Sequence, residues 1–215
     1  MLRMGRRAER EPSPLDAVQR VQAIMTNILF LATITIELVL GISFILTLLL
    51  PDFSVWPPPS RRSWQFWFIW ILVDLSYIGF VAVGIFDWNS FVIDHWIRFP
   101  LGILLILLGF GLAIWGMKIL SYQTSLGLKG EFISSGPYRF TRNPQYVGFI
   151  VLIGGYSILT NSWMTWIAGI LGALLFALTP FLEEPWLEER FGEKYSEYKK
   201  SVPRYLGKPN RPEAP

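Results

Sequence analysis

Residues 136–185 read GPYRFTRNPQYVGFIVLIGGYSILTNSWMTWIAGILGALLFALTPFLEEP, and this stretch decides how the chain is organised. Two polar clusters, 136–142 and Glu183-Glu184, flank a long run that contains no charged residue. Asn161-Ser162 interrupts the run and predicts a tight turn between two helices. If this helical hairpin crosses a membrane twice, both polar clusters return to one surface, where a polar site for a lipid-like molecule can form.

The composition is that of an integral membrane protein. Of the 215 residues, 52% are hydrophobic and 16% are charged, whereas charged residues make up about a quarter of a typical soluble domain. A membrane-spanning helix needs about 20 apolar residues. The segments that qualify are Ile24–Leu50, Gln65–Phe86, Ile97–Ile119, Tyr146–Leu159 and Trp163–Leu182. We therefore expect an all-α fold, a bundle of about five transmembrane helices.

Charge and cysteine content narrow the possible functions. The net charge is +3, and the basic residues fall at the chain ends and in loops, so they do not indicate nucleic-acid binding. The chain has no cysteine, which excludes a disulfide framework, a thiol nucleophile and a thiolate metal site, and we expect no metal. The arginines near the start precede an apolar segment far longer than a signal-peptide core, so this segment is expected to remain as a membrane helix.

The loops give conflicting signals about orientation. With five spans, residues 51–63, 120–143 and the C-terminal tail share one side, and that side carries most of the basic residues between spans. The positive-inside rule therefore places the polar site in the cytoplasm. The same arrangement places the arginine-rich N-terminus outside, which the rule disfavours. A sixth element, or a first segment that does not cross, would remove the conflict.

The two polar clusters resemble a known family. Gly136-Pro-Tyr-Arg-Phe-Thr-Arg-Asn-Pro-Gln-Tyr-Val-Gly148 is similar to the Gly-Pro-Tyr-Arg…Arg-His-Pro…Tyr…Gly signature of integral-membrane methyltransferases, the isoprenylcysteine carboxyl methyltransferase and phospholipid methyltransferase group. Glu183-Glu184-Pro185, with the Phe191-Gly192, Tyr195, Tyr198 and Val202-Pro203-Arg204 that follow, resembles the second half of that pattern. The resemblance implies a methyltransferase-like catalytic core over 97–206, after an N-terminal tail and two spans in 1–96 and before an irregular tail in 207–215.

The resemblance also implies a methyl donor and an acceptor. The donor is S-adenosylmethionine, and the acceptor is a lipid or prenyl-type membrane substrate. The residues implied as cofactor-binding are Gln123, Tyr138, Asn143, Pro144, Tyr146, Gly148, Glu183 and Glu184, and those implied as catalytic are Arg139 and Arg142. Carboxylates suit the donor's ammonium and ribose hydroxyls, a helix start suits its carboxylate, and glycine lets the backbone approach a ligand.

Asn143 is a departure from the family pattern, which has histidine there. The only histidine of the chain is His95, in the opposite loop, so no histidine base is expected at the site. An amine acceptor must lose a proton, whereas a carboxylate needs no base and suits the paired donors of Arg139 or Arg142. The sequence therefore slightly favours carboxylate O-methylation over amine N-methylation. Two alternatives stay open: an NADPH-dependent membrane lipid or sterol reductase, and a non-catalytic scaffold or transporter.

Features outside the family pattern allow two interpretations each. Glu37 and Asp74 lie near the middle of their spans, where a carboxylate needs a partner. They can bond to each other or to Thr33, Thr35 or Tyr77, or they can recognise a cationic or hydroxyl group of a lipid in a substrate cavity.

The glycines of the third span also allow two interpretations. Gly102, Gly109 and Gly116 fall on one helix face, where they favour close helix packing, while Gly109 and Gly111 can instead leave room for a ligand. After Glu184, the spacing of Leu187, Phe191, Tyr195 and Tyr198 predicts an amphipathic interfacial helix, broken at Gly192, whose tyrosines anchor it at the membrane surface.

Overall fold

The computed structural model describes residues 13–50, 52–93 and 95–207. These residues contain no strand, which confirms the all-α prediction. The helices, in order, are α1 (Pro14–Leu49), α2 (Trp64–Phe86), α3 (Arg98–Leu120), α4 (Tyr122–Ser125), the 3-10 turn η1 (Gly136–Arg139), α5 (Pro144–Thr160), α6 (Trp163–Phe191) and α7 (Glu193–Ser201).

Five of these helices coincide with the predicted spans. Within the described residues, α1, α2, α3 and α6 are long and apolar enough to cross a membrane. The fifth, α5, has 17 residues and is about 26 Å long. Serine side chains start several of them: Ser13 and Asp16 cap α1 reciprocally, and Ser63 and Ser162 accept from backbone N–H groups of α2 and α6. The membrane bundle predicted from composition is therefore confirmed.

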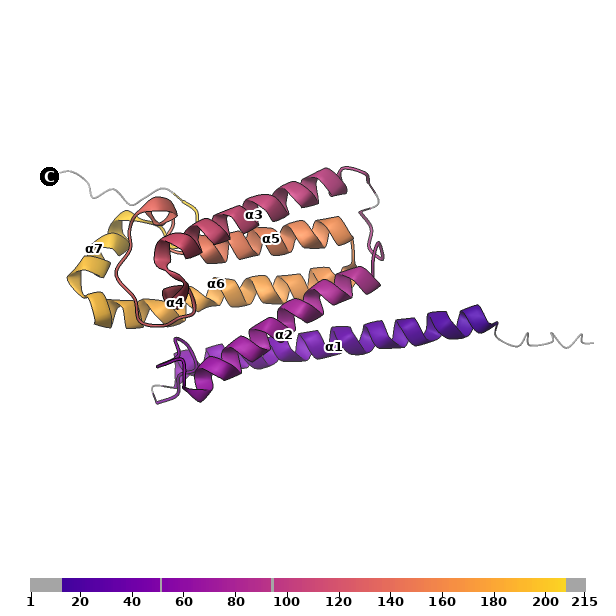
Figure 1. Ribbon diagram of the computed structural model, residues 1–215, viewed down its shortest axis with the longest axis horizontal. Coiled ribbons are helices and arrows are strands. Elements are labelled where there is room, and N and C mark those ends of the chain that lie inside the picture. Colours follow the sequence, from indigo (N-terminus) through magenta and orange to yellow (C-terminus); the bar gives the residue numbers. More distant parts are fainter. Residues whose placement is uncertain (1–12, 51, 94, 208–215) are drawn as a thin grey trace, which may run out of the picture.

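Helices α3 and α5 pack against each other through glycine (Figure 1). A Cβ added at Gly109 would lie 2.5 Å from the carbonyl oxygen of Gly148, and one added at Gly102 would lie 2.8 Å from that of Gly155. Nothing lies within 4 Å of the corresponding position on Gly111. The glycine row therefore packs α3 against α5, and Gly148 is part of this contact. The ligand approach expected of Gly148 stays a prediction.

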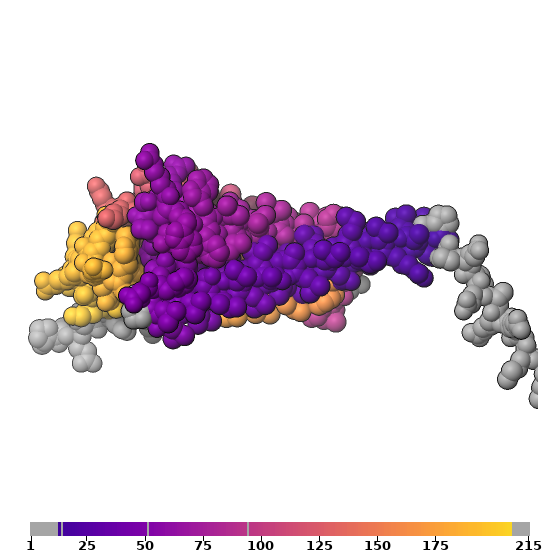
Figure 2. Space-filling view, turned by 90° about the horizontal axis from the view of Figure 1, so that it is seen from below, coloured from indigo at the N-terminus to yellow at the C-terminus, as the bar shows by residue number. Residues whose placement is uncertain are grey.

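Helices α1, α2 and α6 form the second half of the bundle. Leu40 and Phe44 of α1, Ile69 of α2 and Leu182 of α6 share one buried cluster with Trp56. The first turns of α1 extend beyond the other helices and expose their apolar side chains, as Figures 1 and 2 show. Helix α1 runs antiparallel to α2 along the bundle and is long and apolar enough to cross a membrane, and the described residues contain no sixth span. The conflict over the N-terminus therefore persists, and its arginines lie outside the described residues.

The hairpin between α5 and α6 is built as predicted. Asn161 adopts a left-handed conformation (φ 48°) and its side chain bonds to Asn89 and to the backbone of Phe91 and Ile93. Ser162 accepts from the backbone of Thr165 and starts α6. The turn lies beside the loop between α2 and α3, so α6 runs back to the end of the bundle where α5 begins (Figure 1).

The C-terminal region differs from the prediction in two ways. The helix expected after Glu184 does not start there, because α6 continues through Pro185 to Phe191; the break at Gly192 (φ 56°) and the C-terminal helix α7 after it are as predicted. Tyr195 and Tyr198 were expected to anchor the helix in the membrane surface. They are instead buried against Phe132, because the loop between α4 and α5, which includes the 3-10 turn η1, folds over α7.

Candidate active site

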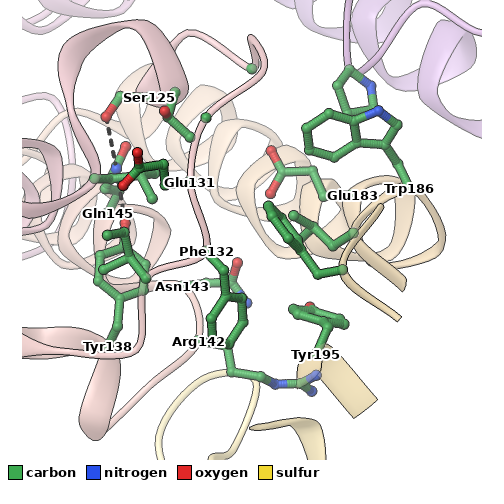
Figure 3. Close-up of a pocket in the computed structure, with 18 of the residues that line it drawn as sticks. Ser125, Glu131, Phe132, Tyr138, Arg142, Asn143, Gln145, Glu183, Trp186 and Tyr195 are labelled. Atoms are coloured by element: carbon green, nitrogen blue, oxygen red, sulfur yellow. Dashed lines mark hydrogen bonds between the residues drawn. The ribbon is translucent and has the colours of Figure 1, made fainter. Parts of the chain in front are cut away.

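The polar stretch between α3 and α5 folds over the ends of α5 and α6 and encloses a small cavity (Figure 3). Its volume is about 100 Å³. Gln145 and Tyr138 lie on one side of it, and Glu183 and Trp186 on the other. The residues that line it include Thr124, Ser125, Glu131, Phe132, Tyr138, Arg142, Asn143, Gln145, Tyr146, Glu183, Trp186, Leu187, Phe191, Tyr195 and Tyr198.

Gln145 organises one wall of this polar cavity. Its side-chain amide donates to the hydroxyl of Tyr138 at 3.0 Å and to that of Ser125 at 3.1 Å. Tyr198 donates to the carbonyl oxygen of Tyr138 at 2.7 Å, which ties α7 to the 3-10 turn. Burial raises the pKa of Tyr138 well above its usual value, so this hydroxyl stays protonated and acts as a hydrogen-bonding group, not as a base.

Glu183 forms the opposite wall. Its Oε1 accepts from the indole N–H of Trp56 at 2.8 Å and from the hydroxyl of Tyr146 at 2.5 Å. Trp56 comes from the loop between α1 and α2, so this carboxylate joins three elements that lie far apart in the sequence. Two donors on one oxygen fix the carboxylate and leave its other oxygen available to a ligand.

Glu184 faces a different environment. It is 6% exposed, and its carboxylate accepts from Arg204 at 2.7 and 2.8 Å and pairs with Nη2 of Arg142 at 3.2 Å. The hydrogen bonds to Glu184 raise the pKa of Arg204, which therefore stays charged. This ion cluster fastens the C-terminal tail to the site, and Arg142 also donates its backbone N–H to Pro203.

Arg142 retains unused donors. Its Nε and Nη1 are buried and have no hydrogen-bond partner among the described residues, and the residue lines the polar cavity. A buried guanidinium with two free N–H directions is costly unless an anion meets it. The residue is therefore suited to bind a carboxylate or phosphate group in the cavity.

A second cavity adjoins the first. It has a volume of about 440 Å³ and lies between α1, α2, α5 and α6, with mostly apolar walls. Ser125, Gln145 and Tyr146 line both cavities. A polar compartment at the bundle end and an apolar compartment within the bundle therefore meet at these three side chains.

The structure brings half of the predicted site residues together. Tyr138, Arg142, Asn143, Tyr146 and Glu183 line the polar cavity. Asn143 also donates its side-chain amide to the carbonyl oxygen of Arg204 at 3.0 Å. For these five residues, the expected roles in binding and catalysis stay predictions.

The other five predicted residues do not line this cavity. Gln123 and Arg139 are exposed, because α4 and the 3-10 turn direct them outward. Pro144 is buried at the start of α5 near Gly116, where its missing N–H costs little. Gly148 packs against Gly109, and Glu184 is occupied by the two arginines.

Several residues of the site were missed from the sequence. Gln145 lies inside the motif that we quoted, yet we assigned it no role. Trp56, in the loop between α1 and α2, is 6% exposed and bonds to Glu183. Glu131 and Phe132 belong to a loop without any recognisable pattern. No group of three metal-ligating side chains occurs among the described residues.

Part of the chain matches a known protein family. Residues 97–194 match the family model described as phospholipid methyltransferase. The match confirms the resemblance to the integral-membrane methyltransferases.

One curated relative is phosphatidylethanolamine N-methyltransferase of Yarrowia lipolytica (strain CLIB 122 / E 150), which is 30% identical over 155 residues. The aligned region covers 65% of this chain, and the chain spans only 16% of that relative.

Proposed function

We propose that this protein transfers a methyl group from S-adenosylmethionine to a lipid held in the membrane. The observation that carries the proposal is the common wall of Ser125, Gln145 and Tyr146 between the polar and the apolar cavity. A polar donor and a lipophilic acceptor can meet only where a water-facing and a membrane-facing compartment join. The family match over residues 97–194 supports methyl transfer as the reaction at that junction.

The residues of the polar cavity fit the chemical groups of this donor. The unpaired N–H groups of Arg142 suit its carboxylate. The aromatic side chains of Phe132, Trp186 and Tyr195 suit its adenine and its cationic centre. When bound, the donor supplies an electrophilic methyl group on a sulfonium. The cavity volume of about 100 Å³ is below the 300–1,000 Å³ usual for such ligands, so we expect the loop 126–135 to move outward on binding.

For the acceptor, we favour an amine of a phospholipid headgroup. The carboxylate preference rested on the absence of a histidine base, and Glu183 offers a base in the polar cavity, hydrogen-bonded to Tyr146 of the junction. Its free oxygen can hold the acceptor ammonium and take the proton that the nitrogen must lose, while Trp56 and Tyr146 fix its position. The name of the relative, an N-methyltransferase, supports the same choice.

A carboxylate acceptor is the second candidate. It is favoured by the free N–H groups of Arg142, which can align a carboxylate instead of the donor. Vesicles that contain phosphatidylethanolamine or a farnesylated cysteine, incubated with radiolabelled S-adenosylmethionine, distinguish the two. Label in the phosphatidylethanolamine supports the amine, and label released from the farnesylcysteine as a base-labile ester supports the carboxylate.

Calorimetric titration of the purified protein tests the activity class. Binding of S-adenosylhomocysteine without binding of NADPH supports the methyltransferase, NADPH alone supports a reductase, and neither supports a scaffold or transporter.

The variant Arg142→Lys keeps the charge that faces Glu184 but loses the guanidinium fork, and is expected to weaken S-adenosylhomocysteine binding about tenfold. Arg139→Lys is the matched control, because Arg139 is exposed outside the cavity. Equal binding by the two variants would remove Arg142 from the site.

We also propose that the site faces the cytoplasm, because the loops at this end carry more basic residues than those at the other end.

A further inference from the structure

The apolar cavity contains one buried carboxylate that the proposed reaction does not use. Glu37 of α1 lines this cavity and is 3% exposed. Its Oε1 accepts a hydrogen bond from the hydroxyl of Ser76 of α2 at 3.0 Å. Its Oε2 is buried and has no partner among the described residues. An unpartnered carboxylate oxygen in the wall of an apolar cavity is a site for a polar group of a ligand.

None of the groups expected to pair with Glu37 bonds to it among the described residues. Tyr77 lines the same cavity, but no hydrogen bond joins it to Glu37. The hydroxyls of Thr33 and Thr35 donate to backbone carbonyls one turn earlier in α1. Asp74 lines the same cavity but is exposed, and no hydrogen bond joins it to Glu37. Across the cavity wall, Gly172 of α6 presents no side chain to the carboxylate. One oxygen of Glu37 therefore stays without a partner at the wall of this cavity.

Glu37 lies deep in the bundle, well below the junction of the two cavities. A Cβ added at Gly172 would lie 3.6 Å from Oε1 of Glu37, so these residues are level with each other. Glu183 lies eleven residues after Gly172 in α6, which corresponds to about 16 Å along the helix axis at 1.5 Å per residue. A lipid whose headgroup reaches Glu183 would therefore place part of its hydrocarbon chain beside Glu37.

We propose that Glu37 and Ser76 bind a hydroxyl group on the hydrocarbon chain of the lipid acceptor. This inference rests on the proposed function for the position of the headgroup. A hydroxyl can donate to a carboxylate oxygen or accept from a protonated carboxyl, so the contact forms in either protonation state of Glu37. A cationic group would have to leave water for an apolar cavity at a much higher cost than a hydroxyl. The site therefore selects chains that carry a hydroxyl over plain chains.

Native mass spectrometry or calorimetry of the purified full chain with oleate and ricinoleate tests this preference. The two fatty acids differ by one mid-chain hydroxyl. We expect the wild type to bind ricinoleate about 2- to 10-fold more tightly than oleate, the range of one net hydrogen bond. Glu37→Leu is expected to abolish the preference, and Glu37→Gln, whose amide can donate and accept, is expected to retain most of it.

Thr35→Val is the matched control on the same helix, because Thr35 is exposed and does not line the cavity. Equal binding of the two fatty acids by the wild type, or an unchanged preference in Glu37→Leu, would overturn the proposal. S-adenosylhomocysteine binding, measured in parallel, separates the two hypotheses. Its absence in the wild type contradicts the proposed function, whereas the hydroxyl preference reports only on Glu37.

Discussion

Replacing Gly148 by alanine tests whether this position serves helix packing or ligand approach. The added Cβ would lie 2.6 Å from the carbonyl oxygen of Gly109 and 2.7 Å from the backbone nitrogen of Ala113. Ordinary contacts are 3.4–4 Å, so the two helices would have to separate by about 1 Å, since backbone atoms cannot move aside as a flexible side chain can.

The magnitude follows from two opposing terms. Overpacking of this kind costs about 1–3 kcal/mol, while alanine gains up to about 1 kcal/mol over glycine in a helix. We expect a net loss of about 1–2 kcal/mol. At this chain length that loss lowers the melting temperature by about 2–8 °C.

Gly154→Ala is the matched control on the same helix. Nothing lies within 4 Å of its added Cβ, so only the helix-propensity gain remains. Thermal unfolding of both variants in the same detergent provides the comparison. Equal melting temperatures would refute the packing argument. If Gly148→Ala melts like the wild type but loses S-adenosylhomocysteine binding, the original expectation of ligand approach is right after all.

Substitutions at three further positions probe the site. Glu184→Ala leaves two arginines facing each other and is expected to lower the free energy of unfolding by about 2–3 kcal/mol. This is below the range for fully buried pairs, because Arg204 is partly exposed. Faster proteolysis of the C-terminal tail is the expected result, and a tail as protected as in the wild type would contradict it. Tyr146→Phe removes one donor from Glu183 and is expected to slow methyl transfer about tenfold while S-adenosylhomocysteine affinity changes little; an unchanged rate would argue against a role for the fixed carboxylate. Asn143→Ala removes a donor to the carbonyl of Arg204 and is expected to lower the free energy of unfolding by about 0.5–1 kcal/mol. Asn143→His keeps an N–H donor and is expected to retain that stability. Equal losses in the two variants would argue against a contribution from this hydrogen bond.

The spans and the hairpin could be predicted because they depend on short-range patterns. The length of an apolar run fixes whether a helix can cross, and Asn161-Ser162 supplies both the left-handed residue and the cap that the turn needs. The helix boundaries are within a few residues of those expected, except where α1 and α6 continue into polar sequence.

The partners of individual polar side chains could not be predicted in this way. Glu183 and Glu184 are neighbours, yet a helix of 3.6 residues per turn directs them about 100° apart. One therefore faces the cavity and the other faces the tail. Nothing near Glu184 in the sequence indicates that Arg204 binds it, since the pairing depends on the path of the chain after Gly192. Phe132 entered the site for the same reason, by contact with tyrosines far along the chain.

The short length of α5 explains why polar chemistry can approach the membrane interior at this place. Its 17 residues cover about 26 Å, less than the 30 Å of a bilayer's hydrocarbon core. If its far end lies at the opposite boundary, its first turn begins within the hydrocarbon region, where polar groups must find partners in the protein. Gln145 and Tyr146 do so by bonding to Ser125, Tyr138 and Glu183. The same bonds that make a short span tolerable also build the wall between the two cavities, so the length of this helix and the position of the site have one physical cause.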